Sequence, residues 1–327
     1  METRKLIRII ALVASILVTG CASSAKKNQN PIIEESVGTS LVVTQEQQGP
    51  AAPASTIKPV VLVLSPGAAR AFAQAGVIRA LTDAKIRIGA VLGTEVGALI
   101  GATYSIQPQM NAFEWQLQKI RETEFIQASR FLGIGQEYPM EAVALSKQLD
   151  QIFGNKSFKD LKIPLILSVE EKGAQNFALI KQGSLTKALR ASIAIEGLLK
   201  EVQFENREVR ASMRSKPYLV QEARALGIGP VILVDSLAYS SDRIQKTQSD
   251  DLDADLEDIE KRISQNYEEA RDHHRSEREQ ADLVITPDVR SIGLLDFKRK
   301  NEAIYSGKQS VTALLPKIRE LTGQAKP

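Results

Sequence analysis

The amino-acid sequence predicts an α/β/α sandwich, an α/β fold with a mostly parallel central sheet covered by helices on both faces. Continuous apolar runs, typical of strands buried on both faces of a parallel sheet, alternate with segments of helical periodicity. The expected strands are residues 60–64, 88–93, 163–170, 230–236 and 281–287. Helical patterns follow the first two strands, over residues 69–84 and 95–105. The β-α-β-α order favours parallel neighbours joined by helical crossovers.

The composition is typical of a globular chain with a sizeable core. Of the 327 residues, 43% are hydrophobic and 25% charged, and the formal net charge is +3. This weak charge argues against a nucleic-acid partner or an acidic substrate. The two histidines, His273 and His274, are adjacent in a charged stretch. On a helix their rings point about 100° apart and do not readily bind one ion, so we expect no metal and no cofactor.

The N-terminus resembles a bacterial lipoprotein signal peptide over residues 1–20. A basic start precedes the apolar run Leu6–Val18, which is too short to span a bilayer, and "LVTGC" ends at Cys21. The resemblance implies cleavage before Cys21 and attachment of a diacylglyceryl group to its thiol. Ala22 and Ser23 then imply export to the outer membrane, facing the periplasm. The alternative is an ordinary signal peptide or a short anchor with a chance cysteine.

Three further regions follow the signal peptide. Residues 21–58 are polar and predict a flexible tether from the lipidated cysteine. Residues 59–321 form the expected domain, and 322–327 a short tail. Within the domain, the charged segment 249–280 predicts an amphipathic helix. Its narrow apolar stripe consists of Leu252, Leu256, Ile259 and Ile263. We expect the helix to pack on the domain edge, with docking of a partner as the alternative.

Several motifs occur in an order and spacing known from one family. "VVLVLSPGAARAF" joins a strand to a small-residue loop, and "VLGTEVGALIG" joins a strand to a glycine turn and a helix. "ASIAIEGLLKEVQFENREVRASMR" and "ADLVITPDVRSIGLLDF" follow later. Together they resemble the patatin-like phospholipase family, from residue 59 to about 321. That resemblance implies a serine–aspartate dyad and an oxyanion hole of loop N–H groups, used for lipid acyl hydrolysis.

The family's catalytic positions hold other residues in this chain. The serine of the G-x-S-x-G elbow corresponds to Glu95, between Gly93 and Gly97, and the dyad aspartate corresponds to Ala211. Alanine cannot accept a proton, and a carboxylate is a weak nucleophile that carries negative charge where the oxyanion would form. The resemblance therefore implies a degenerate, catalytically inactive member with no intact catalytic residue.

The oxyanion loop is also altered. Its positions correspond to Pro66, Gly67 and Ala68, and the family's loop arginine is retained as Arg70. Proline has no N–H group, and alanine resists the positive φ that glycine allows. We therefore expect the oxyanion hole to lack a donor or to be misshapen. For Glu95, we hypothesise an ion pair with Arg70 that fills the former oxyanion site. The alternative is that Arg70 ties backbone carbonyls together while Glu95 points to solvent.

Three functions remain open from the sequence. The first is an inactive lipoprotein, attached to a membrane through Cys21, that binds a lipid or acyl group or a protein partner. The second is a phospholipase or esterase with a displaced nucleophile, Ser65 or Ser212. The third is an interaction protein that docks through the helix at 249–280. An apolar cleft beside Glu95 would favour lipid binding, whereas an exposed stripe on that helix would favour docking.

Overall fold

The computed structural model describes residues 33–35, 57–121, 125, 139–173, 176–239 and 254–324. All of the described residues belong to one compact unit, within residues 31–327. The expected signal peptide, Cys21 and Leu252 lie outside the described residues. Within the described part, no helix has both the length and the apolar character needed to cross a bilayer.

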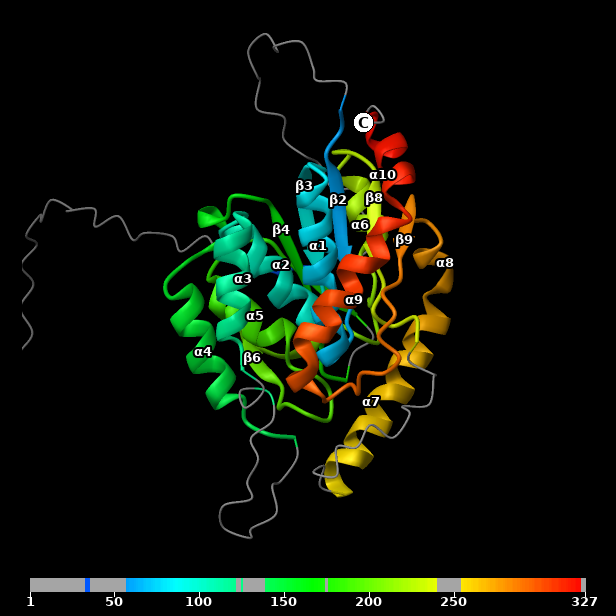
Figure 1. The fold of residues 1–327 in the computed structure, drawn as a ribbon. Helices are drawn as coiled ribbons and strands as arrows, with labels where there is room; N and C mark the ends of the chain where they lie inside the picture. Colours follow the sequence, from blue (N-terminus) through cyan, green and yellow to red (C-terminus); the bar gives the residue numbers. More distant parts are fainter. Residues whose placement is uncertain are drawn as a thin grey trace, which may run out of the picture. The chain divides into compact units, whose positions relative to one another are not determined.

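The described strands form one mixed sheet, mostly parallel, with helices on both sides (Figure 1). The strands are β1 (Ile33–Glu35), β2 (Val60–Leu64), β3 (Ile88–Gly93), β4 (Leu165–Glu171), β5 (Phe177–Ile180), β6 (Val202–Phe204), β7 (Arg207–Ala211), β8 (Val231–Val234) and β9 (Leu283–Ile285). Their order across the sheet is β1-β5-β4-β3-β2-β8-β9, with β7 also pairing with β4, and β6 with β7.

The parallel core consists of the five strands expected from the sequence. β4, β3, β2, β8 and β9 are consecutive parallel neighbours. β2 and β3 have the expected bounds, and the other three are shorter by one to four residues. The remaining pairs are antiparallel, and the connections from β4 to β5 and from β6 to β7 are too short for a crossover. β1 pairs with β5 although it lies within the expected tether, so that region is not wholly without regular structure.

Helices surround the sheet. The 3-10 turns are η1 (Ala68–Phe72), η3 (Phe158–Asp160) and η4 (Phe297–Arg299). The α-helices are α1 (Ala73–Asp83), α2 (Val96–Ile106), α3 (Met110–Lys119), α4 (Val143–Phe153), α5 (Leu185–Ser192), α6 (Val220–Ala225), α7 (Ala254–His273), α8 (Arg275–Arg278), α9 (Lys300–Thr312) and α10 (Leu315–Thr322). Figure 1 shows α1 and α9 side by side, and α6 lies against β2 and β8.

Two glycines bring α1 and α9 into backbone contact. A Cβ atom on Gly76 of α1 would lie 1.8 Å from the carbonyl oxygen of Ile304, and one on Gly307 of α9 would lie 1.7 Å from that of Ala73. Atoms cannot approach so closely, so only glycine fits at either position. This contact fixes α9 against α1, and η1, which carries Arg70, is continuous with α1.

The charged segment at 249–280 forms two helices rather than one. α7 ends at His273 and α8 begins at Arg275. Leu256, Ile259 and Ile263 are all buried, so the apolar stripe of α7 faces the domain rather than solvent. The described stripe therefore offers no exposed docking surface.

Candidate functional site

The chain turns sharply between β3 and α2 at Glu95. Glu95 has φ 58° and ψ −128°, a combination that side-chain-bearing residues rarely adopt. Gly93 and Gly97 make the turn possible. A Cβ on Gly93 would lie 2.8 Å from the Cα of Ala98, and one on Gly97 would lie 2.6 Å from the carbonyl oxygen of Leu64. The strained elbow is therefore retained although a glutamate occupies its apex.

The Glu95 side chain points inward and is fully buried. Its Oε1 atom accepts hydrogen bonds from the backbone N–H groups of Ala68, at 2.7 Å, and Gly67, at 3.3 Å. Its Oε2 atom accepts a hydrogen bond of 2.5 Å from the hydroxyl of Tyr267. Donors from the loop and from α7 thus converge on one carboxylate. The alternative in which Glu95 points to solvent is wrong.

The loop before η1 keeps its N–H donors, contrary to the expectation from its sequence. Ala68 adopts φ 46° despite its side chain, and its N–H and that of Gly67 both point at the carboxylate. A left-handed alanine costs roughly 1–2 kcal/mol, which the surrounding packing can offset. Pro66 does not remove a donor from this site, because the two N–H groups used belong to the next two residues. The expectation of a misshapen loop is wrong.

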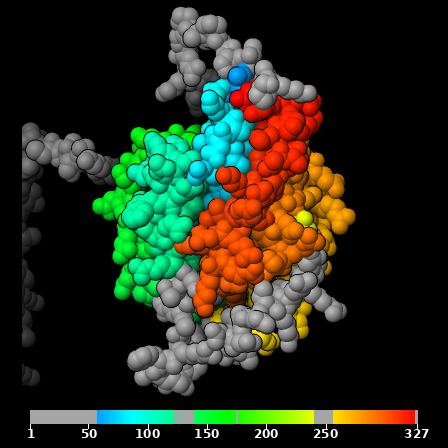
Figure 2. Space-filling view, viewed as in Figure 1, coloured from blue at the N-terminus to red at the C-terminus, as the bar shows by residue number. Residues whose placement is uncertain are grey.

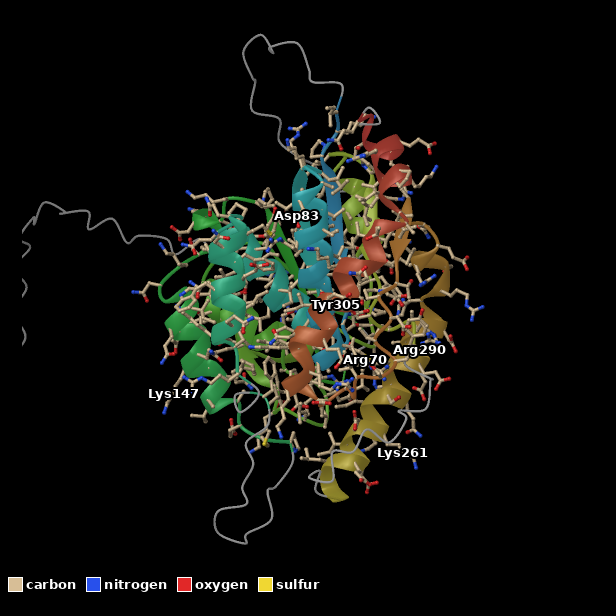
Figure 3. The ribbon with its side chains drawn as sticks, viewed as in Figure 1. Arg70, Asp83, Lys147, Lys261, Arg290 and Tyr305 are labelled. Carbon is tan, nitrogen blue, oxygen red and sulfur yellow. The ribbon has the colours of Figure 1, made fainter. Side chains whose placement is uncertain are left out.

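Arg70 holds other parts of the chain together. Its side chain is fully buried, and its guanidinium donates to the carbonyl oxygens of Ile292, at 2.7 Å, and Tyr239, at 2.9 Å. Figure 3 labels Arg70 in the interior between α9 and α7. Among the described hydrogen bonds of Glu95, the donors are Gly67, Ala68 and Tyr267. The interpretation of Arg70 as a tie to backbone carbonyls is therefore confirmed, and the internal anion is held by groups other than the expected arginine.

Burial and hydrogen bonding act in opposite directions on the Glu95 carboxyl. Desolvation raises the pKa of Glu95, while the hydrogen bonds from Tyr267 and the backbone N–H groups of Ala68 and Gly67 oppose that rise. The pKa of the Tyr267 hydroxyl is raised well above its usual value, first by burial and then by the nearby Glu95 charge. Tyr267 therefore keeps its proton and serves as a hydrogen-bond donor.

Tyr267 is the site residue that sequence reasoning missed. It is four residues after Ile263 and three before Ala270, and all three are buried. The residue therefore continues the apolar stripe of α7, at the helical spacing that first identified the stripe. The spacing alone could have placed Tyr267 on the buried face, but nothing in it indicates Glu95 as the partner.

A second carboxylate fixes α7 over the site. Glu260 accepts hydrogen bonds from the backbone N–H groups of Leu294 and Leu295. In turn, the carbonyl oxygen of Leu294 accepts from the N–H of Ala69 at 2.9 Å. The helix is thus connected to the segment before η4 through Glu260, and to the elbow through Tyr267.

Ala211 lies at the end of β7, opposite Val169 of β4. It is buried, and its N–H donates to the carbonyl oxygen of Ala194 at 3.1 Å. A methyl group at this position can neither take nor deliver a proton, so Ala211 cannot assist a nucleophile.

The two serines considered as displaced nucleophiles are both buried and hydrogen-bonded. Ser65 donates from its hydroxyl to the carbonyl of Pro66 and accepts from the N–H of Ser236. Ser212 donates to the hydroxyl of Ser168, at 2.5 Å, and lies 3.3 Å from the carbonyl of Lys216. Both hydroxyls therefore join neighbouring segments of the fold, and neither contacts a base suited to activating it.

The histidine pair lies on the surface near a polar cleft. The two rings pack edge to face, and His274 Nε2 lies 2.9 Å from the carbonyl oxygen of Arg214. The cleft has a volume of about 840 Å³ and is lined by charged and polar side chains, including Arg210, Arg214 and Asn266. Within the described residues, no cluster of three or more His, Cys, Asp or Glu side chains suits a metal ion.

Comparisons with known proteins agree with this geometry. The family model described as patatin-like phospholipase matches residues 62–220. Patatin-like phospholipase domain-containing protein 6 of Mus musculus is 28% identical over 151 residues, covering 43% of this chain and 10% of that protein. Neuropathy target esterase sws of Drosophila virilis is 29% identical over 143 residues, covering 42% of this chain and 9% of that protein. This chain thus spans about a tenth of the length of these relatives.

Among solved structures, VipD from Legionella pneumophila matches with 11% identity and a TM-score of 0.47, covering 81% of this chain and 67% of that one. The matched segment 62–220 contains the loop, the elbow and Ala211, the residue expected at the position of the dyad aspartate. Residues 62–220, just under half of the chain, therefore match the patatin-like phospholipase family.

Proposed function

We propose that this patatin-like protein does not hydrolyse lipids and acts instead as a lipid-binding protein of the bacterial envelope. One observation carries the proposal: the Glu95 carboxylate occupies the N–H groups of Gly67 and Ala68 that would stabilise an oxyanion. The site thus holds its own anion in place of a reacting substrate. The relatives' names, which specify phospholipase and esterase, indicate lipid as the ligand class.

Two further features support the absence of turnover. Ala211 supplies no base, and α7 closes over Glu95 through Tyr267. In a hydrolase whose working residues act as a unit, losing them lowers kcat by about a millionfold. The stripe of α7 that could have docked a protein partner is buried in the described residues, which argues against docking through that stripe.

The first experiment measures phospholipid and p-nitrophenyl ester hydrolysis by the chain starting at Ala22. It compares the natural chain with Glu95→Ala, with a Glu95→Ser/Ala211→Asp double variant, and with that double variant carrying Tyr267→Phe. We expect background rates for the natural chain and Glu95→Ala, and a measurable gain when serine and aspartate are restored. Turnover by the natural chain that persists in Glu95→Ala but disappears in Ser65→Ala or Ser212→Ala would instead establish a displaced nucleophile.

Lipid binding is tested separately from turnover. A fluorescent phospholipid titrated into the natural chain should bind saturably, and the recovered lipid should keep both acyl chains. Release of a fatty acid during the titration would contradict the proposal, and so would the absence of saturable binding.

We propose further that the mature chain is held through acylated Cys21 to the outer membrane, facing the periplasm. The signal-peptide pattern supports this attachment, and two or three acyl chains, at about 0.8 kcal/mol per buried methylene, give a stable anchor. Mass spectrometry of the mature protein should show a diacylglyceryl group on Cys21. Cys21→Ala should move the protein from the membrane fraction to the soluble fraction. An unmodified cysteine would contradict the proposed anchor and leave the assignment of Glu95 unaffected.

A further inference from the structure

Two large aromatic side chains are exposed on two helices that line the same groove. Trp115 of α3 is 65% exposed, and Tyr305 of α9 is 64% exposed. Figures 1 and 2 show α3 and α9 on the face turned to the viewer, with α1 between them, and Figure 3 labels Tyr305 on α9. We call the outer surface of α1, α3 and α9 the aromatic face.

The aromatic face contains a groove of about 480 Å³. Phe113, Leu117 and Ile304 supply apolar lining, and Trp115, Gln118 and Asn301 also line it. Gln118 Nε2 donates to the side-chain oxygen of Asn301 at 3.3 Å, which links α3 to α9 across the groove. The Trp115 ring is therefore attached to a rigid support and remains open to solvent.

The elements of this face carry more cationic than anionic side chains. On η4, α1, α3 and α9 the anions are Asp83, Glu114 and Glu302, and the cations are Arg79, Lys119, Lys298, Arg299, Lys300 and Lys308, six against three. Ion pairs link Arg79 with Asp83 and Glu114, Lys308 with Asp83, and Arg299 with Glu302. The Lys119 ammonium lies 5.5 Å from the centre of the Trp115 ring. The face is thus weakly basic as well as aromatic.

We propose that the aromatic face docks on the headgroup layer of an anionic phospholipid bilayer. Trp and Tyr place an apolar ring and a polar N–H or O–H at such an interface, and lysines beside them attract anionic headgroups. The excess of cationic side chains on the aromatic face complements the negative charge of the phospholipid headgroups. The inference rests on the proposed function only in assuming that the protein is located at a membrane. The face lies apart from Glu95, and its test uses a chain without the lipid anchor.

Trp115 is the only tryptophan of the chain, so its fluorescence reports directly on this face. The chain starting at Ala22, which lacks Cys21, is mixed with vesicles of phosphatidylglycerol and phosphatidylethanolamine and with vesicles of phosphatidylcholine. We expect a blue shift of the tryptophan emission and co-sedimentation with the anionic vesicles, both weakened by salt. Phosphatidylcholine vesicles should produce neither effect.

Variants test whether these rings make the contact. Trp115→Ala and Tyr305→Ala should each lower vesicle binding by roughly tenfold, and Trp115→Phe by less. Val143→Ala, which alters an exposed apolar side chain on α4 (52% exposed), should leave binding unchanged. All variants should unfold near the natural temperature, because the altered side chains are exposed.

Three results would overturn the proposal: no blue shift with anionic vesicles, equal binding to both vesicle types, or vesicle binding that is unaffected by Trp115→Ala. The last result together with a loss of binding to a purified envelope protein would assign the face to a protein partner instead. None of these outcomes bears on hydrolysis or on Cys21. A failure here is therefore distinguishable from a failure of the proposed function.

Discussion

The hydroxyl of Tyr267 lies 2.5 Å from Oε2 of Glu95, and both side chains are buried. This contact joins the apex of the elbow to α7, which begins more than 150 residues later in the chain. With the N–H groups of Gly67 and Ala68 on the other oxygen, the carboxylate connects three separate segments of the fold. Glu95 thus holds these segments together, at the position that the sequence predicts for the family's nucleophile.

Removing the Tyr267 hydroxyl should destabilise the protein. Tyr267→Phe leaves Oε2 of a buried carboxylate without its described donor, which costs about 1.5–3 kcal/mol for a hydrogen bond to a charged group. Urea unfolding at pH 7 measures the loss. Tyr305→Phe removes a hydroxyl from an exposed ring and should change the free energy of unfolding by less than about 0.5 kcal/mol. Equal effects of the two variants would mean that the Glu95 contact contributes nothing.

The raised pKa of Glu95 predicts a specific pH dependence. Burial raises the folded pKa above the ordinary value of 4.5. The stabilising contribution is therefore fully present below the ordinary pKa and is lost as the pH rises through the folded pKa. Relative to Glu95→Gln, which carries no charge, the natural chain should lose stability as the pH rises above the ordinary pKa of 4.5, as unfolding in urea at several pH values would show.

The comparison with Glu95→Gln isolates the contribution of the Glu95 carboxyl to the pH dependence of stability. Burial also raises the pKa of Glu260 and of Glu277, but those groups are present in both proteins and cancel in the difference. Glu320→Gln, at an exposed side chain, provides the matched control for replacing a carboxylate by an amide. A pH-independent difference for Glu95→Gln would show that the Glu95 pKa is not raised.

We expect that the contact between α1 and α9 tolerates no side chain at position 76. Gly76→Ala places a methyl group where the backbone of Ile304 already lies, so the two helices must move apart. Overpacking of this kind typically costs 1–3 kcal/mol, and a backbone clash should cost at least about 3 kcal/mol. Thermal unfolding gives the result, with Gln309→Ala on the exposed side of α9 as the control. An unchanged melting temperature for Gly76→Ala would mean that the helices are not in this contact.

Replacing a buried lysine near α6 should cause a larger loss in the free energy of unfolding. The Lys216 ammonium lies 2.9 Å from Glu277 and 3.2 Å from Glu222, and all three side chains are largely buried. Lys216→Met leaves two carboxylates without their shared cation, which costs about 3–5 kcal/mol at neutral pH. The loss should shrink in acid, because burial raises the pKa of both glutamates and protonation then removes their charges.

Lys317→Met serves as the comparison for Lys216→Met, because its ion pair with Glu320 is exposed. Such surface pairs contribute about 0–1 kcal/mol. Unfolding in urea at pH 7 and at pH 4 separates the two variants. Similar losses for both would indicate that Lys216 is hydrated rather than buried.

The sequence by itself determined the parallel strands and the elbow, and it predicts that Glu95 and Ala211 stand in place of the family's serine and aspartate. These features follow from local patterns: apolar runs for buried strands, glycines at a sharp turn, and motifs in a fixed order. A close neighbour at Gly76 could also be predicted, since a glycine inside a helix indicates close packing. The sequence could not show that this neighbour is α9.

Only the tertiary structure decided what surrounds Glu95. The sequence suggested Arg70, the nearest cation of the loop, whereas the structure shows that Arg70 binds the carbonyls of Ile292 and Tyr239. Tyr267 reaches Glu95 because α7 buries its apolar stripe against the domain, and the spacing of that stripe specifies a buried face but not the atom that each residue meets. The loop at Ala68 likewise kept its donors because tertiary contacts imposed a positive φ that local preference disfavours. Local periodicity encodes elements, but the partners of a buried polar group depend on how distant elements pack together.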